Sequence, residues 1–236
     1  MVAFAVVVVA AAACVQGSVG FGFALMSAPV LVLVSPDLVP GPVLAASSVL
    51  SLAAAVREHA SIDRRGVSLL LVGRLPGAIA GASLLRWLPP AAAGVVFGAL
   101  VLLGVLLSAL GLHVARSPRN LVAIGLLSGV MGTTTAAGGP PIALIYQDTE
   151  GPALRSTLNA YFACGSVLSI TVLAISGQFG LRDLVAGAWM LPSVWLGFAC
   201  SKRLHGALDR GLTRAAVLLI AGGCAAAVVV KALWFS

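Results

Sequence analysis

Charged and turn residues divide this chain of 236 residues into eight long apolar segments. The segments cover residues 2–34, 40–56, 66–88, 92–112, 119–146, 155–176, 183–201 and 213–234. Six of them are close to the roughly 20 residues that one helical membrane span needs. The first and the fifth are longer, and each carries a glycine-rich stretch at its middle. The pattern predicts an all-α polytopic membrane protein whose first and fifth segments are either long tilted helices or hairpins of two short helices.

The glycine-rich stretches of the first and fifth segments are two copies of one motif. The first copy, residues 17–29, reads GSVGFGFALMSAP, and the second, residues 129–141, reads GVMGTTTAAGGPP. Two glycines and the terminal proline coincide at one fixed offset. Self-similarity at a fixed period is a strong sign of a duplicated fold. We therefore predict two membrane repeats, residues 1–115 and 116–236, each of about four helical segments with the first one broken or re-entrant.

The composition requires lipid around most of the chain. Hydrophobic residues make up 60% and charged residues 9% of the sequence, and the mean hydropathy is +1.10. A soluble domain of this length could not bury that much apolar surface. The formal net charge of +7 comes mainly from basic residues in the short loops between apolar segments. That placement favours a signal for membrane topology over a surface that binds nucleic acid.

The basic residues discriminate between long helices and hairpins in the first and fifth segments. If all eight segments crossed the membrane, seven basic residues would lie on one side and six on the other. If these two segments are re-entrant, ten lie on one side and three on the other, with Arg74 set aside because it falls within a segment. Cytoplasmic loops carry an excess of lysine and arginine. We therefore predict re-entrant hairpins, both termini outside, and two halves inverted relative to each other.

Each glycine-rich break falls at membrane depth, where irregular backbone is tolerated only beside protein or a water-filled cavity. Pro29 and Pro141 suit the first turn of a helix that returns from the break. The free N–H groups of such helix starts attract anions, and polar residues near the breaks add hydrogen bonds. The predicted substrate-binding residues are Gln16, Gly17, Gly20, Gly22, Ser47, Arg74, Gly132, Thr133, Thr134, Thr135, Gly138, Gly139 and Asn159. The alternative for the glycines is close packing of helices through small residues.

Arg74 lies well inside an apolar segment, about a third of the way into residues 66–88, whereas the other basic residues lie at or near segment ends. A guanidinium inside a span indicates a functional site by default, and its planar fork suits an oxyanion. In one interpretation Arg74 faces a cavity and supplies countercharge to the substrate. In the other it snorkels to the membrane surface beside Arg64 and Arg65. The sequence leaves both interpretations open.

No arrangement of residues in the sequence suggests catalysis or a bound metal. The seven acidic residues fall at or near segment ends, and the four cysteines lie inside apolar runs without metal-ligand spacing. The sequence contains neither a nucleophile–base set nor a Walker motif. We therefore predict a protein that is not an enzyme and that needs no cofactor.

Three features resemble the TauE/SafE family of bacterial membrane permeases, the sulfite exporter family. They are the duplicated glycine-rich break ending in proline, the small polar positions Ser47–Ser48 and Asn159, and the charged turn after each third span. The resemblance covers nearly the whole chain. It implies a multi-pass protein of the bacterial inner membrane that transports sulfite, organosulfonates or related small sulfur-containing or carboxylate anions. The first copy departs from the second, because it has Phe21 and Phe23 where the second has Thr133 and Thr135.

The sequence as a whole predicts a secondary transporter that alternates access between two pseudo-symmetric halves. Its expected partners are a small anionic substrate and the lipid bilayer, with a proton or a sodium ion as candidate coupling ion and no nucleic acid. A homo-oligomer is compatible with the sequence. Two other functions remain open: a passive anion channel with the same site, and a non-transporting membrane assembly subunit whose glycines serve helix packing alone.

Overall fold

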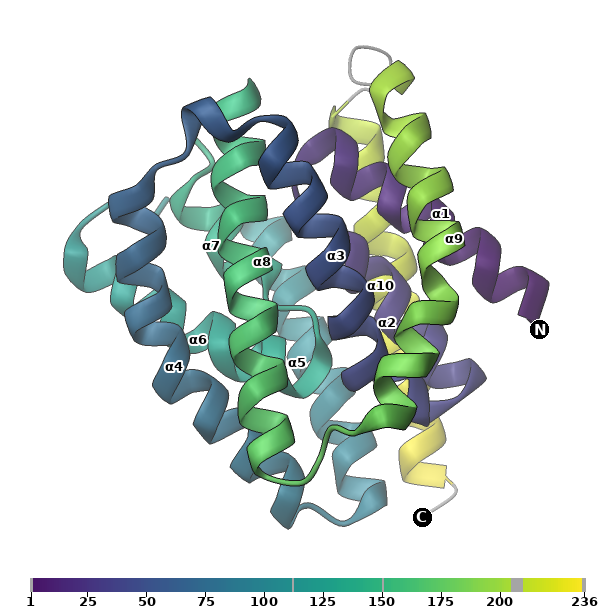
Figure 1. The fold of residues 1–236 in the computed structure, drawn as a ribbon. Coiled ribbons are helices and arrows are strands. Elements are labelled where there is room, and N and C mark those ends of the chain that lie inside the picture. The colour runs from purple at the N-terminus through teal and green to yellow at the C-terminus, as the bar shows by residue number, and fades with distance from the viewer. Residues whose placement is uncertain (1, 112, 150, 205–209, 235–236) are drawn as a thin grey trace.

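The computed structural model describes residues 2–111, 113–149, 151–204 and 210–234. These residues form helices joined by short turns, and none of them forms a strand (Figure 1). The helices are α1 (Val2–Val19), α2 (Phe23–Val34), α3 (Gly41–Arg57), α4 (Arg64–Trp87), α5 (Pro90–Leu110), α6 (Pro118–Thr135), α7 (Gly139–Ile145), α8 (Gly151–Ile175), α9 (Leu181–Leu204) and α10 (Arg210–Trp234), with short 3₁₀ turns at Pro36–Leu38 and His59–Ser61. Six of the described helices are long and apolar enough to cross a membrane: α3, α4, α5, α8, α9 and α10. They correspond to the six apolar segments that lack a glycine-rich motif, which confirms that part of the prediction.

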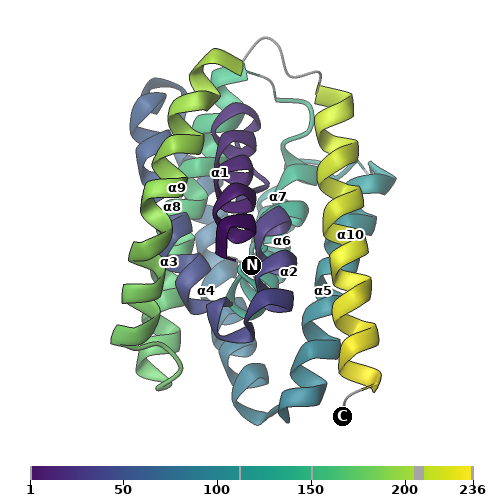
Figure 2. The same ribbon diagram turned by 90° about the vertical axis from the view of Figure 1, so that its right-hand side faces the viewer.

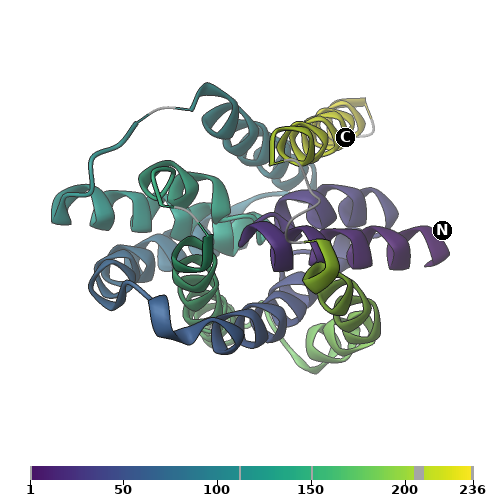
Figure 3. The ribbon, with the colours of Figure 1, turned by 90° about the horizontal axis from the view of Figure 1, so that it is seen from above.

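The first and fifth apolar segments are each broken into two helices, which excludes a single long helix for either. The first break follows α1 and contains Gly20 and Gly22, whose φ angles of 101° and 116° suit glycine because it lacks a Cβ atom. The second break follows α6 at Ala136, which adopts a left-handed conformation with φ of 61°. The helices on either side of each break pack against each other. In the view from above, the purple pair α1 and α2 runs side by side toward the edge that carries the N-terminus (Figure 3).

The two returning helices do not start at equivalent positions of the motif. Pro141 is the third residue of α7 and therefore lies in its first turn, as predicted. Pro29 lies well inside α2, because that helix already begins at Phe23, so the prediction that Pro29 starts the returning helix is wrong. The two glycines with positive φ let the chain turn immediately after α1. The second copy has Gly132 and Thr134 at the equivalent positions, both still inside α6, and it begins its returning helix further along the motif.

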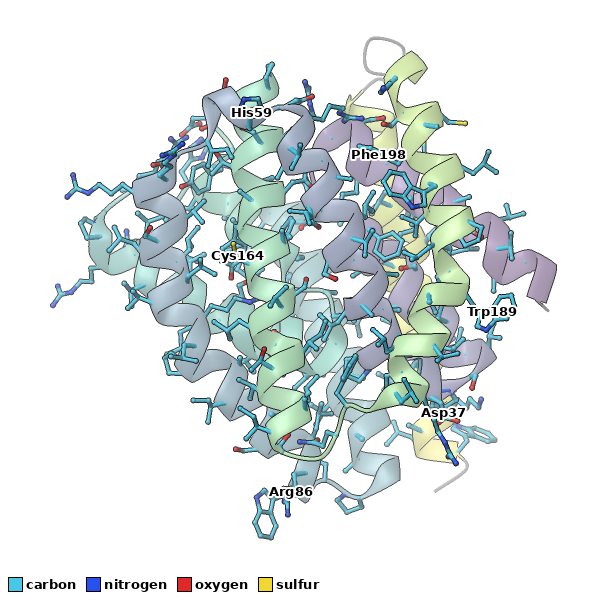
Figure 4. All side chains as sticks on the ribbon, in the orientation of Figure 1. Asp37, His59, Arg86, Cys164, Trp189 and Phe198 are labelled. Carbon is cyan, nitrogen blue, oxygen red and sulfur yellow. The ribbon has the colours of Figure 1, made fainter. Side chains whose placement is uncertain are left out.

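The bundle has one end rich in basic residues and one end poor in them. The backbone N–H of Asp63 donates to Thr157 Oγ1 at 3.0 Å, which places the starts of α4 and α8 together. At the opposite end Arg86 donates to the carbonyl of Ser176 at 2.9 Å. Figure 4 shows His59 at the first end and Arg86 at the other. We call the first end, which carries Arg57, Arg64, Arg65, Arg116, Arg155 and Lys202, the basic end.

Small residues bring several helices into close contact. A Cβ atom added at Gly77 of α4 would meet the backbone of Leu126 in α6, and one added at Gly197 of α9 would meet the backbone of Ala10 in α1. Gly129 of the second motif lies against the backbone of Arg74, since a Cβ atom added there would be 2.5 Å from the Arg74 carbonyl oxygen. Close packing of helices through small residues, the alternative role for the glycines, therefore occurs where α4 packs against α6 and where α1 packs against α9. Helices α5 and α10 form a separate pair at one side (Figure 2).

Candidate functional site

The two helix breaks meet at one buried pocket with a volume of about 30 Å³. Residues of both breaks line it, together with side chains from α1, α3, α4 and α8. The lining residues are Gln16, Phe21, Gly22, Ala24, Leu25, Ser47, Arg74, Ala136, Ala137, Gly138, Gly139, Phe162 and Ser166. Residues from both predicted repeats therefore contribute to a single pocket.

Gln16 holds the first break in place through its side-chain amide. Its Oε1 accepts a hydrogen bond of 3.2 Å from the backbone N–H of Phe23, the first residue of α2. Its Nε2 donates to Ser51 Oγ at 2.9 Å and to Asn159 Oδ1 at 3.0 Å. The side chain is only 3% exposed, so these bonds satisfy an amide that would otherwise be buried without partners. One residue of α1 thereby ties the break to α3 and α8.

Hydroxyl groups hold the second break in place. Thr135 Oγ1 accepts a 3.1 Å hydrogen bond from the backbone N–H of Ala137 and donates to the carbonyl of Met131. Ser128 Oγ donates to the carbonyl of Gly138 on the far side of the break. These contacts satisfy backbone groups that the interrupted helix leaves without intrahelical partners. The break is therefore a hydrogen-bonded structure and not a frayed helix end.

Arg74 reaches the pocket from α4 and is only 2% exposed, so it does not snorkel to the membrane surface. Its Nε donates to the carbonyl of Gly165 at 2.9 Å. Its Nη1 donates to Tyr161 Oη at 3.0 Å and to Ser128 Oγ at 3.4 Å, and its Nη2 donates to Ser169 Oγ at 3.1 Å. The ring of Tyr161 also lies 5.1 Å from Cζ, within range of a cation–π contact.

Two glycines make room for the Arg74 guanidinium. A Cβ atom added at Gly132 of α6 would lie 2.8 Å from Nη2, and one added at Gly165 of α8 would lie 2.6 Å from Cζ. Both distances are shorter than real side chains show, so any larger residue at either position has to displace the guanidinium. The position of the charge is thus determined by α6 and α8 as well as by α4.

The charge of Arg74 has no carboxylate beside it. The ion pairs among the described residues are Arg57 with Glu58, Arg155 with Glu58, and His113 with Asp148. All four hydrogen-bond partners of Arg74 are neutral oxygens. A buried charge that is hydrogen-bonded but not neutralised is costly, because protein dipoles replace only part of its hydration. The arrangement is therefore suited to an anion that enters the pocket.

A chain of hydrogen bonds connects Arg74 to the second break. Arg74 donates to Tyr161, the Tyr161 hydroxyl donates to Ser128 Oγ at 2.9 Å, and Ser128 donates to the carbonyl of Gly138. Thr133 Oγ1 and Ser169 Oγ lie 2.9 Å apart and extend the network on the Nη2 side. Hydrogen bonds in such a chain polarise one another in a site of low dielectric. A change at the guanidinium is therefore coupled to the backbone of the break.

Two aromatic rings cover the apolar side of the pocket. Phe21 and Phe162 both line it, and a Cβ atom at Gly139 would lie 3.4 Å from the Phe162 ring and 3.8 Å from Phe21. Phe21 also lines a second pocket of about 150 Å³. Tyr146 lines that second pocket and donates a 2.8 Å hydrogen bond to Asp63 at the basic end. Phe21 therefore borders both the central pocket and a cavity toward the basic end.

The structure brings together most of the residues predicted for the site. Six of them line the pocket: Gln16, Gly22, Ser47, Arg74, Gly138 and Gly139. Two more touch residues that line it, since Asn159 bonds to Gln16 and Gly132 lies against Arg74. Thr133 is one contact further away, because it bonds to Ser169, which itself bonds to Arg74.

Four predicted site residues lie away from the pocket lining. Gly17 packs against Ser201 and Phe198, and its carbonyl accepts a 2.6 Å hydrogen bond from Arg57. Gly20 lies against the backbone of Arg155. Thr135 holds the second break through its hydroxyl, and Thr134 donates to the carbonyl of Val130 and lines a separate pocket between α2, α5 and α10.

Several residues of the site were not among those predicted from the sequence. They are Ser51, Ser128, Tyr161, Phe162, Gly165, Ser166 and Ser169. On α8 a helical spacing could have revealed part of this set, because Asn159, Phe162, Ser166 and Ser169 recur every three or four residues. The helical spacing of these residues along one face of α8 is therefore the signal that could have identified them.

A comparison with protein families matches residues 4–228 to the family described as Sulfite exporter TauE/SafE. The matched range includes both breaks, Arg74 and all the pocket-lining residues. No curated protein and no solved structure matches the chain.

Proposed function

Since the chain belongs to the sulfite exporter TauE/SafE family, we propose that it is a secondary transporter for a small oxyanion such as sulfite or an organosulfonate. The family membership confirms the resemblance found in the sequence. The chain is a multi-pass membrane protein with at least six apolar helices long enough to span a bilayer among its described residues. The proposed location is the bacterial inner membrane, with the basic end in the cytoplasm because loops on that side are enriched in lysine and arginine.

One observation carries the choice of an anion as substrate. Arg74 is buried among neutral hydrogen-bond acceptors at the point where the two breaks meet. A guanidinium has five N–H groups, and the described residues supply four hydrogen-bond partners. One N–H of Nη2 therefore remains for a ligand, and a bound anion would compensate the charge.

The contacts between helices support a division into two halves, because the same pattern of contacts results when the helices of one half are exchanged with those of the other. If α1–α5 are exchanged with α6–α10 in order, the contact of α4 with α6 becomes that of α9 with α1, and both are extensive. In the same way α3 with α9 becomes α8 with α4, and α2 with α10 becomes α7 with α5. The pairs α3 with α8 and α5 with α10 are converted into themselves. Inverted repeats with the substrate site at their interface are a recurrent architecture of alternating-access transporters.

Phe21 suits the role of a barrier in this cycle. It is the residue that lines both the central pocket and the cavity toward the basic end among the described linings. Rocking of one half against the other would move the first break, and Phe21 with it, relative to Phe162 on α8. The central pocket would then open toward the basic end without a change in the residues that hold the anion.

Counterflow in proteoliposomes tests the proposed function. Vesicles containing the purified protein are loaded with unlabelled sulfite and diluted into a trace of radiolabelled sulfite. A carrier produces a transient accumulation of label, because each outward turnover allows label to enter. A passive channel produces equilibration without an overshoot, and an assembly subunit gives the same result as protein-free vesicles. Either of the last two outcomes would contradict the proposal.

Cysteine labelling tests the orientation separately. In a cysteine-free background, Arg65→Cys at the basic end and Trp87→Cys at the opposite end are both exposed positions. We expect a membrane-impermeant thiol reagent to label position 87 and not position 65 in spheroplasts. Labelling of position 65 alone would show that the protein has the opposite orientation, and it would leave the proposed anion site unchanged.

A further inference from the structure

We propose that the pocket selects singly charged oxyanions over doubly charged ones of the same size and shape. This inference rests on the proposed function, since it concerns the charge of the anion that the central pocket takes. It follows from a count of the charges and free donors that the pocket presents.

Among the described residues that line the pocket, Arg74 alone carries a formal charge. The other side chains there are Gln16, Ser47, Ser166 and apolar groups. None of the ion pairs in the described part of the chain involves a residue of the pocket. The side chains therefore give the pocket a charge of one positive unit.

The helix ends at the two breaks add little to that charge. Each break places the end of one helix, at Val19 or Thr135, a few residues from the start of the next. The partial negative charge of a helix C-terminus opposes the partial positive charge of a helix N-terminus, so the two largely cancel at a break. The first N–H of α2 is already taken by Gln16, and Pro140 and Pro141 in the first turn of α7 have no N–H.

The remaining polar groups are neutral hydroxyls. No hydrogen bond within the described residues engages the hydroxyl of Ser47 or Ser166, although both side chains are almost fully buried. Together with the spare N–H of Arg74 they give the pocket three side-chain donors for a ligand. Three oxygens of a sulfonate or hydrogensulfite ion match this number. The Gln16 amide is excluded from this count because all its donors and its acceptor oxygen are already engaged.

The opposite wall cannot accommodate a second negative charge. It consists of Phe21, Phe162, Ala24, Leu25 and Ala137, which supply no polar side-chain atom. A dianion would leave one charge facing this wall, and a buried charge without a partner is strongly unfavourable. A monoanion whose fourth substituent is a methyl group or a lone pair would present an apolar face to it. The pocket therefore distinguishes the two classes by charge and not by size.

Methanesulfonate and sulfate form the probe pair, because they are both tetrahedral and similar in size but carry one and two charges. We would measure dissociation constants for each with the purified full chain in lipid nanodiscs at fixed ionic strength. The expected result is that methanesulfonate binds on the order of 100-fold more tightly, since the second charge has no partner. Equal affinities, or tighter binding of sulfate, would overturn the charge selectivity while leaving an anion site in place. Binding of neither probe would overturn the proposed function as well.

A pH series with sulfite provides an independent readout on the same protein. Sulfite exchanges between a monoanion and a dianion near neutral pH, while methanesulfonate keeps its single charge. We expect sulfite affinity to fall as pH rises through that protonation, and methanesulfonate affinity to stay flat. Tyr161 on α8 is the one titratable side chain among the described contacts of Arg74, and it is the same neighbour for both probes. A parallel pH dependence of the two probes would contradict the inference.

Discussion

The first helix break is held by the amide of Gln16, whereas the second is held by the hydroxyls of Thr135 and Ser128. The first break contributes an aromatic ring, Phe21, and two glycines with positive φ. The second is connected through Tyr161 and Ser128 to the buried charge of Arg74. Both breaks line the same pocket, but only the second is coupled to its charge.

This difference separates two tasks that a symmetric site would combine. The first break forms a neutral wall and a barrier, and its own hydrogen bonds determine its shape. The second break holds backbone groups that respond to the guanidinium, so we expect anion binding to affect it more strongly. Under the proposed duplication, the two copies of the motif occupy corresponding positions while their side chains have different roles. Substitutions that act on one break alone can test this division.

The largest effect is expected from Gly132→Leu in the second motif. Leucine would occupy the space of the Arg74 guanidinium, since even a Cβ atom there lies 2.8 Å from Nη2. We expect sulfite counterflow to fall to the level of protein-free vesicles, with insertion into the membrane preserved because leucine favours it. Gly223→Leu on α10 is the matched control, since a Cβ atom there meets nothing within 4 Å. Normal counterflow in Gly132→Leu would remove the guanidinium from the transport mechanism.

Gly20→Ala, at the equivalent position of the first motif, is expected to reduce stability instead. The left-handed conformation costs an L-residue about 1–2 kcal/mol, and the added Cβ would also lie 2.9 Å from the Arg155 Cα atom. Gly177→Ala has a similar positive φ but meets nothing within 4 Å, so it isolates the conformational part. Unfolding of the purified proteins should rank Gly20→Ala as less stable than Gly177→Ala. The reverse order would show that the contact with Arg155 is unimportant.

A smaller effect is expected when the hydrogen bonds of the breaks are removed one at a time. Gln16→Leu removes the acceptor of the Phe23 N–H and the donor to Asn159 Oδ1, and should cost about 1–3 kcal/mol of stability. Thr135→Val keeps the shape and removes one acceptor, so its cost should be close to the lower end of that range. Chemical unfolding measures both. Equal stability of the two variants would contradict the claim that the hydrogen bonds of Gln16 stabilise the first break more than the hydroxyl of Thr135 stabilises the second.

The smallest effect on affinity is expected from Phe21→Ala. The ring donates no hydrogen bond to an anion, so the dissociation constant should change little. Access should change more, because the substitution joins the central pocket to the cavity of about 150 Å³ toward the basic end. In a cysteine-free background, Ser166→Cys should react several-fold faster with a small hydrophilic thiol reagent when Phe21 is alanine. An unchanged reaction rate would exclude Phe21 as the barrier.

Hydrophobicity and glycine placement predicted the architecture because both act locally. The lengths of the apolar segments predicted the six long helices, and the paired glycine-rich motifs predicted where two segments break. The position of Pro29 was predicted wrongly because proline is tolerated both at a helix start and, in membrane helices, within one. Which of these applies depends on where the preceding turn forms. Here that turn depends on Gly20 and Gly22 and not on the proline.

The direction of Arg74 could not be predicted because it depends on residues distant in the sequence. The space for the guanidinium comes from Gly132 and Gly165, and its acceptors come from α6 and α8. A similar limit applied to the threonines of the second motif. Thr133 faces the network of Arg74, while Thr134 bonds to its own helix and turns away. Three adjacent residues on a helix point in different directions, so a run of one residue type does not mark one site.

The affinity of an anion for Arg74 variants tests the central claim most directly. We would measure the dissociation constant of methanesulfonate for the parent protein, Arg74→Gln, Arg74→Lys and the control Arg86→Gln, whose arginine is exposed at the end of the same helix. Loss of a charge-assisted hydrogen bond should weaken binding to Arg74→Gln by about 1–3 kcal/mol. Lysine should restore only part of that, because an ammonium group cannot reproduce the planar fork, and Arg86→Gln should bind like the parent. Four equal dissociation constants would contradict the account and place any bound anion elsewhere than beside Arg74.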